Sequence, residues 1–335
     1  MTLTPIALLR SNLPDTRPVV ALSEGTDPRV VEGGLAARQL GLADVILVGP
    51  ADKVQATLAD VGGSEGDGVW IHDPDRSDLT TSFTAEYLAL RKHKGVDEAK
   101  ASAAARDPLV YAAMLVRLGH AVGTVGGAVA TTSDVVRAAI QVIGKAPDAA
   151  MVSSFFMMYP PDDARAHARA MLYSDCGLVI DPTSDELVAI AAASAKSARA
   201  LLRAEPQIAM LSFSTKGSAK HSVIDKVTTA TQTLHENHPD LSVDGELQFD
   251  AAFVPSVGER KSPGSSVAGQ ANVMIFPNLD AGNISYKITQ RLGGYAAIGP
   301  ILQGLAKPAN DLSRGCSAED VTEMIAVTVL QSQSN

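Results

Sequence analysis

The segment Arg17–Pro50, RPVVALSEGTDPRVVEGGLAARQLGLADVILVGP, decides the fold. It begins and ends with short apolar runs rich in β-branched residues, Arg17–Ser23 and Asp44–Pro50, which are typical of buried strands. Between them lies a helical pattern with Thr26 as a candidate N-cap, a proline in the first turn and a glycine near the end. A strand, a helix and a strand at this spacing predict a parallel pair joined by a crossover.

Outward from this unit, the same alternation continues along the chain. We expect a third strand at Val69–Asp73, a long polar helix at Thr80–Arg106 and a second helix at Asp107–Ala121. A strand and turn at Gly123–Asp134 then lead into the helix VVRAAIQVI. These elements predict one α/β domain.

A second α/β set follows the turn cluster GKAPD at residues 144–148. Helices are expected at ELVAIAAASAKSARALL and from Ser222 to Glu236. Strands are expected at five buried runs: AMVSSFFMM, CGLVIDP, QIAMLSF, AAFVP and ANVMIFP. A chain of 335 residues is long enough for two such domains.

Composition and charge exclude several classes of protein. The net charge of −9 argues against nucleic acid or an anionic membrane as a partner, because both require clustered Lys and Arg. The start has no long apolar run, and no stretch of about 18 apolar residues occurs. The two cysteines are too few for a disulfide framework, and the seven histidines lack metal-ligand spacing. We expect a soluble, cytoplasmic protein without a metal site.

The segment Gly293–Asp320, GGYAAIGPILQGLAKPANDLSRGCSAED, carries the strongest functional signal. Ser317 and Asp320 have the spacing of a capping box before a final helix, and on this interpretation Ser313 and Arg314 are ordinary loop residues. The alternative is an anion site, because the first turn of a helix offers free N–H groups and a positive dipole end. A hydroxyl, a guanidinium and a carboxylate there could handle a thiol, a phosphate and a proton.

The runs AGNISYKITQRLGG and GLAKPANDLSRG, with SEGTDPRV, LRKHKG and TTSDVVRAAIQVI nearer the start, resemble the phosphate acetyltransferases. The resemblance covers essentially the whole chain. It implies two α/β domains with mainly parallel sheets and an interdomain cleft, in an architecture like isocitrate and isopropylmalate dehydrogenases. Residues 1–146 plus 298–335 would form domain 1 and residues 147–297 domain 2. It also implies a homodimer.

The resemblance further implies a reaction and its catalytic residues. Acetyl would move reversibly between acetyl phosphate and coenzyme A by direct thiol attack in a ternary complex, with coenzyme A as a substrate and no permanently bound cofactor. Asp320 matches the family's base, and we expect partial burial to raise its pKa. Ser313 matches the serine that positions the thiol sulfur, and Arg314 matches the arginine that holds phosphate.

Four further residues match substrate-binding positions. Arg91 and Arg137 correspond to phosphate-contacting arginines, although a solvated helix face would explain either of them equally simply. Ser133 and Lys287 are weaker matches, for the acyl phosphate and for coenzyme A phosphates. An N-cap serine and a surface lysine are the competing interpretations.

Three other functions compete with acetyl transfer. A phosphate acyltransferase for propionyl or butyryl groups differs by a few methylenes, each worth about 1–3 kcal/mol in a pocket. A non-catalytic, acetyl-CoA-sensing domain would share the fold but would not need the complete residue set. A decarboxylating dehydrogenase is disfavoured because the chain lacks clustered Asp ligands for a divalent metal.

Overall fold

The computed structural model describes residues 4–11, 16–161 and 167–333. The chain forms two compact units, which we call the terminal unit (residues 3–147 and 305–335) and the inserted unit (residues 148–304). The sequence places the return to the first unit near residue 298. In the structure the strand β10, Ala296–Gln303, still pairs with β5 of the inserted unit, so the chain returns only after Gly304.

The terminal unit contains a five-stranded sheet in the order β11-β4-β1-β2-β3, with every pair parallel. Its strands are β1 (Val19–Leu22), β2 (Asp44–Val48), β3 (Val69–His72), β4 (Gly123–Gly126) and β11 (Ala309–Asp311). The parallel pairing of the first two strands is therefore confirmed. Their apolar residues are buried because helices cover both faces of the sheet.

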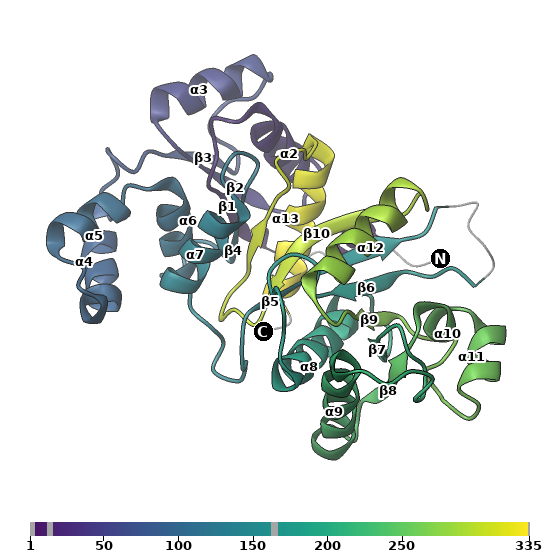
Figure 1. Cartoon of the computed structure of the whole chain (residues 1–335). Helices are drawn as coiled ribbons and strands as arrows, with labels where there is room; N and C mark the ends of the chain where they lie inside the picture. The colour runs from purple at the N-terminus through teal and green to yellow at the C-terminus, as the bar shows by residue number, and fades with distance from the viewer. Residues whose placement is uncertain (1–3, 12–15, 162–166, 334–335) are drawn as a thin grey trace. The chain divides into compact units, whose positions relative to one another are not determined.

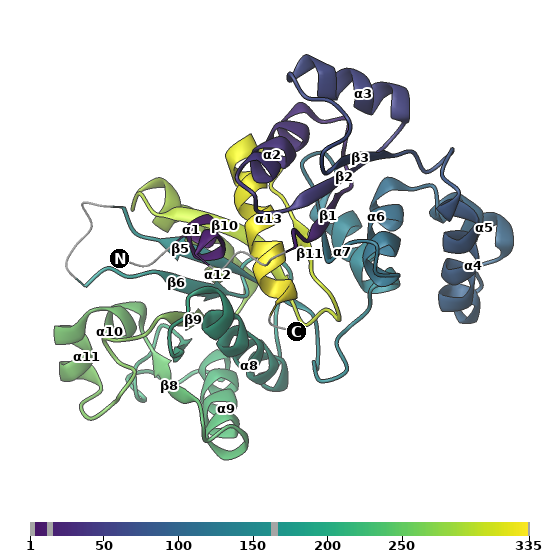
Figure 2. The same ribbon diagram turned by 180° about the vertical axis from the view of Figure 1, so that it is seen from behind.

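Helices α2 (Pro28–Gln39) and α13 (Ala318–Ser332) pack together on one face, and α6 (Pro108–Arg117) and α7 (Thr132–Val142) cover the other (Figures 1 and 2). Gly33 permits the close packing of α2 on α13, since a Cβ there would lie 2.6 Å from the Val321 side chain. The N-cap of α2 is Asp27 rather than Thr26. The remaining helices are α1 (Pro5–Arg10), α3 (Ala51–Asp60), α4 (Leu79–Arg91), the 3-10 turn Lys92–Lys94 and α5 (Glu98–Ala104).

The long helix expected over Thr80–Arg106 is wrong in its length. Helix α4 ends at Arg91 and α5 begins at Glu98. The break lies at Gly95, whose φ of +77° is in the left-handed region that glycine adopts without strain. The polar pattern of the segment hid this helix end.

The inserted unit contains a six-stranded, mainly parallel sheet in the order β10-β5-β6-β9-β7-β8, in which β5 runs antiparallel to both neighbours. Its other strands are β5 (Ser153–Tyr159), β6 (Met171–Ser174), β7 (Gln207–Leu211), β8 (Ser242–Leu247) and β9 (Val273–Ile275). Helices α8 (Ser184–Leu201) and α9 (Ser222–Asn237) pack together on one face.

The opposite face of this sheet carries α10 (Phe249–Phe253), α11 (Pro255–Lys261) and α12 (Leu279–Arg291) (Figure 1). A hydrophobic cluster lies between these helices and the sheet. In it, Phe156 stacks on Tyr286 of α12 with ring centroids 3.9 Å apart, and Ala252 of α10 belongs to the same cluster. Helices α9 and α12 thus start from opposite faces of neighbouring strands, β7 and β9.

Two expected strands of the inserted unit are wrong. CGLVIDP is a loop, because the carboxylate of Asp175 accepts N–H bonds from Gly177 (2.7 Å) and Leu178 (2.9 Å) and turns the backbone. AAFVP lies across the end of helix α10 and the start of α11, where Pro255 stands at a first helical position. Apolar runs this short do not distinguish strand from helix.

Candidate active site

The topological switch point of the terminal unit lies at the carboxyl ends of β1 and β4. These strands are neighbours, but β1 continues into α2 on one face and β4 into α7 on the other. Open α/β sheets bind ligands at such a switch point. The loop after β11 joins them, because the N–H of Leu312 donates to the carbonyl of Gly126 at 2.7 Å.

Ser313, Arg314 and Asp320, which we call the C-terminal cluster, lie between β11 and the first turn of α13. The predicted capping box is confirmed. Oγ of Ser317 accepts the N–H of Asp320 at 3.2 Å, and Oδ2 of Asp320 accepts the N–H of Ser317 at 2.8 Å and its hydroxyl at 3.0 Å. Both capping bonds to Asp320 use the same oxygen. Within the described residues, Oδ1 accepts no hydrogen bond.

Asp320 is exposed, so the partial burial expected for it is absent. Ser313 and Arg314 are exposed as well. The guanidinium of Arg314 makes no hydrogen bond or ion pair with any described residue. The cluster therefore presents a free guanidinium, a hydroxyl and a free carboxylate oxygen at the N-terminal end of a helix, which is favourable for binding an anion.

Helix α7 brings two further expected residues to the carboxyl edge of the sheet. Ser133 is exposed in its first turn, and Thr131, not Ser133, is the N-cap. Arg137 follows one turn later and is also exposed, with Nη1 2.7 Å from Oδ1 of Asp134. The structure places both residues on the helix that follows β4.

Arg91 lies toward the other end of these helices. Arg117, the last residue of α6, donates to Glu86 of α4 at 2.8 Å and to the carbonyl of Val142, the last residue of α7, at 3.1 Å. Arg91 is the last residue of α4 and so lies toward the C-terminal ends of α6 and α7. Arg137 lies more than one turn before the C-terminal end of α7. Nε of Arg91 is buried without a hydrogen-bond partner, so this residue is not simply solvated. No hydrogen bond or ion pair among the described residues links it to the C-terminal cluster, so its role as a phosphate ligand stays a prediction.

Lys287 lies on α12 of the inserted unit. It is exposed, and its Nζ is 2.8 Å from Oδ1 of Asn283 and 5.5 Å from the centre of the Tyr286 ring. These contacts fit an ordinary helix-surface lysine as well as a phosphate ligand.

Three charged residues to which the sequence assigned no role lie at this switch point. Glu24 follows β1, Arg29 begins α2, and Asp311 ends β11. Glu24 and Arg29 stand in SEGTDPRV and Asp311 in PANDLSRG, the runs that carry the family resemblance. That position in the sequence was the only available signal for them.

Asp311 is fully buried at the end of β11. Its Oδ2 accepts the hydroxyl of Thr132 at 2.6 Å, while Oδ1 has no hydrogen-bond partner among the described residues. Oδ1 faces Gly127, where a Cβ would approach it to 2.1 Å. Burial, reinforced by the charge of Glu24, raises the pKa of Asp311 to about 7, although the Thr132 bond opposes this shift.

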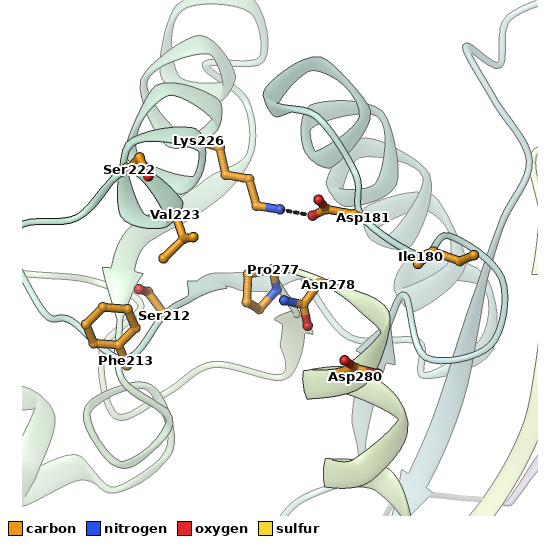
Figure 3. A pocket seen from close by; sticks show the side chains of 10 residues that line it. All are labelled: Ile180, Asp181, Ser212, Phe213, Ser222, Val223, Lys226, Pro277, Asn278 and Asp280. Carbon is orange, nitrogen blue, oxygen red and sulfur yellow. Dashed lines mark hydrogen bonds and ion pairs between the residues drawn. The ribbon is translucent and has the colours of Figure 1, made fainter.

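A hollow of about 540 Å³ lies at the carboxyl edge of the inserted unit, at the switch point between β7 and β9 (Figure 3). Phe213 and Val223 line it, and both are partly exposed apolar side chains. Lys226 reaches across it to Asp181, with Nζ 2.5 Å from Oδ1, and donates to the carbonyl of Pro182. This ion pair is the main polar contact across the hollow.

Two features are absent from the described part of the chain. No group of three or more His, Cys, Asp and Glu side chains is arranged to hold a metal ion. No helix in these residues is both long and apolar enough to cross a membrane.

Comparisons with known proteins agree with this geometry. A family model described as phosphate acetyl/butaryl transferase matches residues 7–329. A phosphate acetyltransferase of Acetivibrio thermocellus is 46% identical over 314 residues, covering 94% of each chain. The crystal structure of a phosphotransacetylase from Streptococcus pyogenes has a TM-score of 0.91 and 40% identity, covering 99% of this chain and 98% of that one.

A 4-hydroxythreonine-4-phosphate dehydrogenase from Klebsiella pneumoniae shares the fold alone, with a TM-score of 0.53 at 12% identity over 96% of this chain and 100% of that one. The expected dehydrogenase-like α/β architecture with mainly parallel sheets is confirmed. The resemblance seen in the sequence is confirmed too: the chain is an acyltransferase and belongs to the phosphate acetyl/butaryl transferase family.

Proposed function

We propose that this protein is a phosphate acetyltransferase that transfers acetyl reversibly between acetyl phosphate and coenzyme A. One observation carries the proposal: Ser313, Arg314 and Asp320 stand together at the start of α13, beside the switch point of the terminal unit, and the Arg314 guanidinium is unpaired. The named relatives supply the substrate class.

The proposed reaction is a direct transfer in a ternary complex. Oδ1 of Asp320, the oxygen not used for capping, takes the proton of the coenzyme A thiol. The thiolate attacks the acetyl carbonyl carbon, a C–S bond forms, and the C–O bond to phosphate breaks. Ser313 orients the sulfur by a hydrogen bond, and Arg314 stabilises the charge on the departing phosphate by a bidentate contact.

The remaining residues have binding roles in this proposal. Arg137 and Arg91 bind substrate phosphate, Ser133 binds the acyl phosphate, and Lys287 binds coenzyme A phosphates. Coenzyme A is a substrate and no cofactor is permanently bound. We also propose that the protein works in the cytoplasm as a homodimer, as the sequence resemblance implies.

The test is thioester formation from coenzyme A with acetyl, propionyl and butyryl phosphates. We expect the highest kcat/KM with acetyl phosphate. A preference for butyryl or propionyl phosphate would make the protein a phosphate acyltransferase for longer groups. Failure to turn over any of the three, with acetyl-CoA still bound, would favour the acetyl-CoA-sensing domain.

A further inference from the structure

Glu24 holds four consecutive backbone N–H groups. Its Oε2 accepts from Gly127 (2.9 Å) and Ala128 (2.7 Å), and its Oε1 accepts from Val129 (3.0 Å) and Ala130 (2.7 Å). Hydrogen bonds to a carboxylate are about twice as strong as those between neutral groups. One side chain therefore fixes the loop 127–130 that leads into α7.

Arg29 joins this loop to the C-terminal cluster. Nη2 donates to the carbonyl of Ala128 at 2.9 Å, and Nη1 donates to the carbonyls of Arg314 at 2.8 Å and Cys316 at 3.2 Å. Asp27 holds the other side of the guanidinium through Nε at 3.0 Å and Nη2 at 2.8 Å. The rigid fork of arginine thus links two loops that come from sequence positions far apart.

We propose that Glu24 and Arg29 are positioning residues for acyl transfer. Glu24 fixes the loop 127–130, and Arg29 ties that loop to the backbone on either side of Gly315, so that Ser133, Ser313 and Arg314 keep one relative geometry. This inference rests on the proposed function. It assigns roles to two residues that contact the backbone rather than the substrates.

The arrangement also limits which groups are available to bind a phosphate at this site. Four adjacent N–H groups would ordinarily form an anion-binding loop, but the carboxylate of Glu24 already occupies them. Phosphate must therefore be held by guanidinium side chains, whose direction depends on the backbone that Arg29 fixes. A displacement of about 1 Å at such a site costs on the order of 10²-fold in rate.

The kinetic test uses Glu24→Gln and Arg29→Lys. Glutamine keeps the shape but turns an NH₂ group toward N–H donors, and lysine keeps the charge but cannot bridge three carbonyls. Each variant should lower kcat about 10–100-fold while KM for either substrate changes by less than about threefold. The double variant should lose little more than the worse single variant, because both act on one loop.

Arg38→Lys is the matched control. Arg38 is on the same helix, about 14 Å further along, and is also tightly bonded, to Asp44 and Asp67. Its kcat should stay within about twofold of wild type, even if its stability falls like that of Arg29→Lys. Unchanged kcat in Glu24→Gln and Arg29→Lys, or an equal loss in the Arg38 variant, would overturn the proposal.

Amide hydrogen exchange gives a readout that does not depend on activity. In Glu24→Gln, peptides covering 127–132 and 313–317 should both exchange faster than in wild type, while β2 and β3 stay unchanged. Exchange that rises in the first segment alone would refute the coupling, whatever the enzyme does. A wild-type chain without transferase activity would remove the proposed function, and the exchange result would still decide the coupling. If Glu24→Gln does not fold, Arg29→Lys carries both measurements.

Discussion

The carboxyl edges of the two sheets have the same topology but different contacts. Both have a switch point where neighbouring strands send their helices to opposite faces. In the terminal unit, hydrogen bonds from the charged side chains of Glu24 and Arg29 link the loops at this point, and Asp311 is buried nearby. In the inserted unit the switch point is an open hollow with one main ion pair, Lys226 to Asp181 (Figure 3).

The difference separates precise geometry from open space. Loops held by many hydrogen bonds can orient reacting groups to within a fraction of an ångström, which acyl transfer requires. A hollow with one exposed ion pair cannot orient them so closely. We therefore expect substitutions to have severe effects at the edge of the terminal unit and almost none in the hollow of the inserted unit.

The largest effect is expected for Asp320→Asn. Asparagine loses part of the capping interaction, which costs within about 1 kcal/mol, so the variant should fold and bind both substrates. If Asp320 is the base, turnover should fall about 10²–10⁴-fold, and the residual rate should rise with pH as solution supplies thiolate. Thermal unfolding and kcat against pH are the measurements. Wild-type turnover in a folded variant would reduce Asp320 to a helix cap.

Arg314→Lys should come next. The guanidinium has no partner among the described residues, so stability should not change, and any loss of activity reports on substrate alone. We expect kcat to fall about 10²–10³-fold, because lysine cannot bind the departing phosphate bidentately. Arg106→Lys, at an exposed ion pair with Asp75, is the control. Near-normal turnover in the Arg314 variant would exclude it from the transition state.

Asp311→Asn tests the effect of burying this carboxyl group. The pKa of Asp311 is about 7 in the folded state and about 3.8 in the unfolded state. Between pH 4 and 7 the carboxyl group therefore takes up a proton when the chain folds. Wild-type stability from this group is therefore full below pH 4 and is lost as pH rises to 7. Asparagine does not titrate, so the free energy of unfolding of the variant should rise relative to that of wild type by about 2–4 kcal/mol between pH 4 and pH 7. Urea titrations at pH 4.5 and 8 measure it, and equal differences at both would contradict the burial argument.

Arg137→Ala and Arg91→Ala should have smaller and unequal effects. Arg137 stands near the carboxyl edge of the sheet, so its loss should raise KM for acetyl phosphate about tenfold, equivalent to about 1.4 kcal/mol. Arg91 lies toward the far end of α7 and should change it by no more than about threefold. Initial rates at varied acetyl phosphate and coenzyme A decide the point. An Arg91 effect equal to that of Arg137 would place both at one phosphate.

Lys226→Met should be nearly silent. Asp181 is 77% exposed, and exposed ion pairs contribute at most about 1 kcal/mol. Unfolding free energy should fall by less than that, and kcat should stay within about twofold of wild type. A tenfold loss of kcat would show that the hollow of the inserted unit takes part in catalysis, and the contrast drawn above would fail.

Sequence patterns predicted the structural features that depend on neighbouring residues. β-branched runs identified β1, β2, β3, β7 and β9, and the spacing of Ser317 and Asp320 identified a capping box that the structure contains. The same reasoning missed β8 and misplaced β6, because CGLVIDP is as apolar as a strand. Only the carboxylate of Asp175 shows why its backbone turns.

The candidate site was predictable only in part, because its organising contacts are long-range. Glu24 binds N–H groups 103 to 106 positions away, and Arg29 binds carbonyls 285 and 287 positions away. No spacing rule links such residues. The burial expected for Asp320 also failed, because a residue in the first turn of a helix is exposed unless another part of the chain covers it.

The late return of the chain to the terminal unit has a consequence for synthesis. Edge strand β11 and helix α13 are made only after all 157 residues of the inserted unit, 148–304. A nascent chain that stops before residue 305 has already made Glu24 and Arg29, but it lacks the carbonyls that Arg29 binds and every member of the C-terminal cluster. Chains that end before residue 305 should therefore be inactive. Activity then appears only after β11 and α13 have been translated.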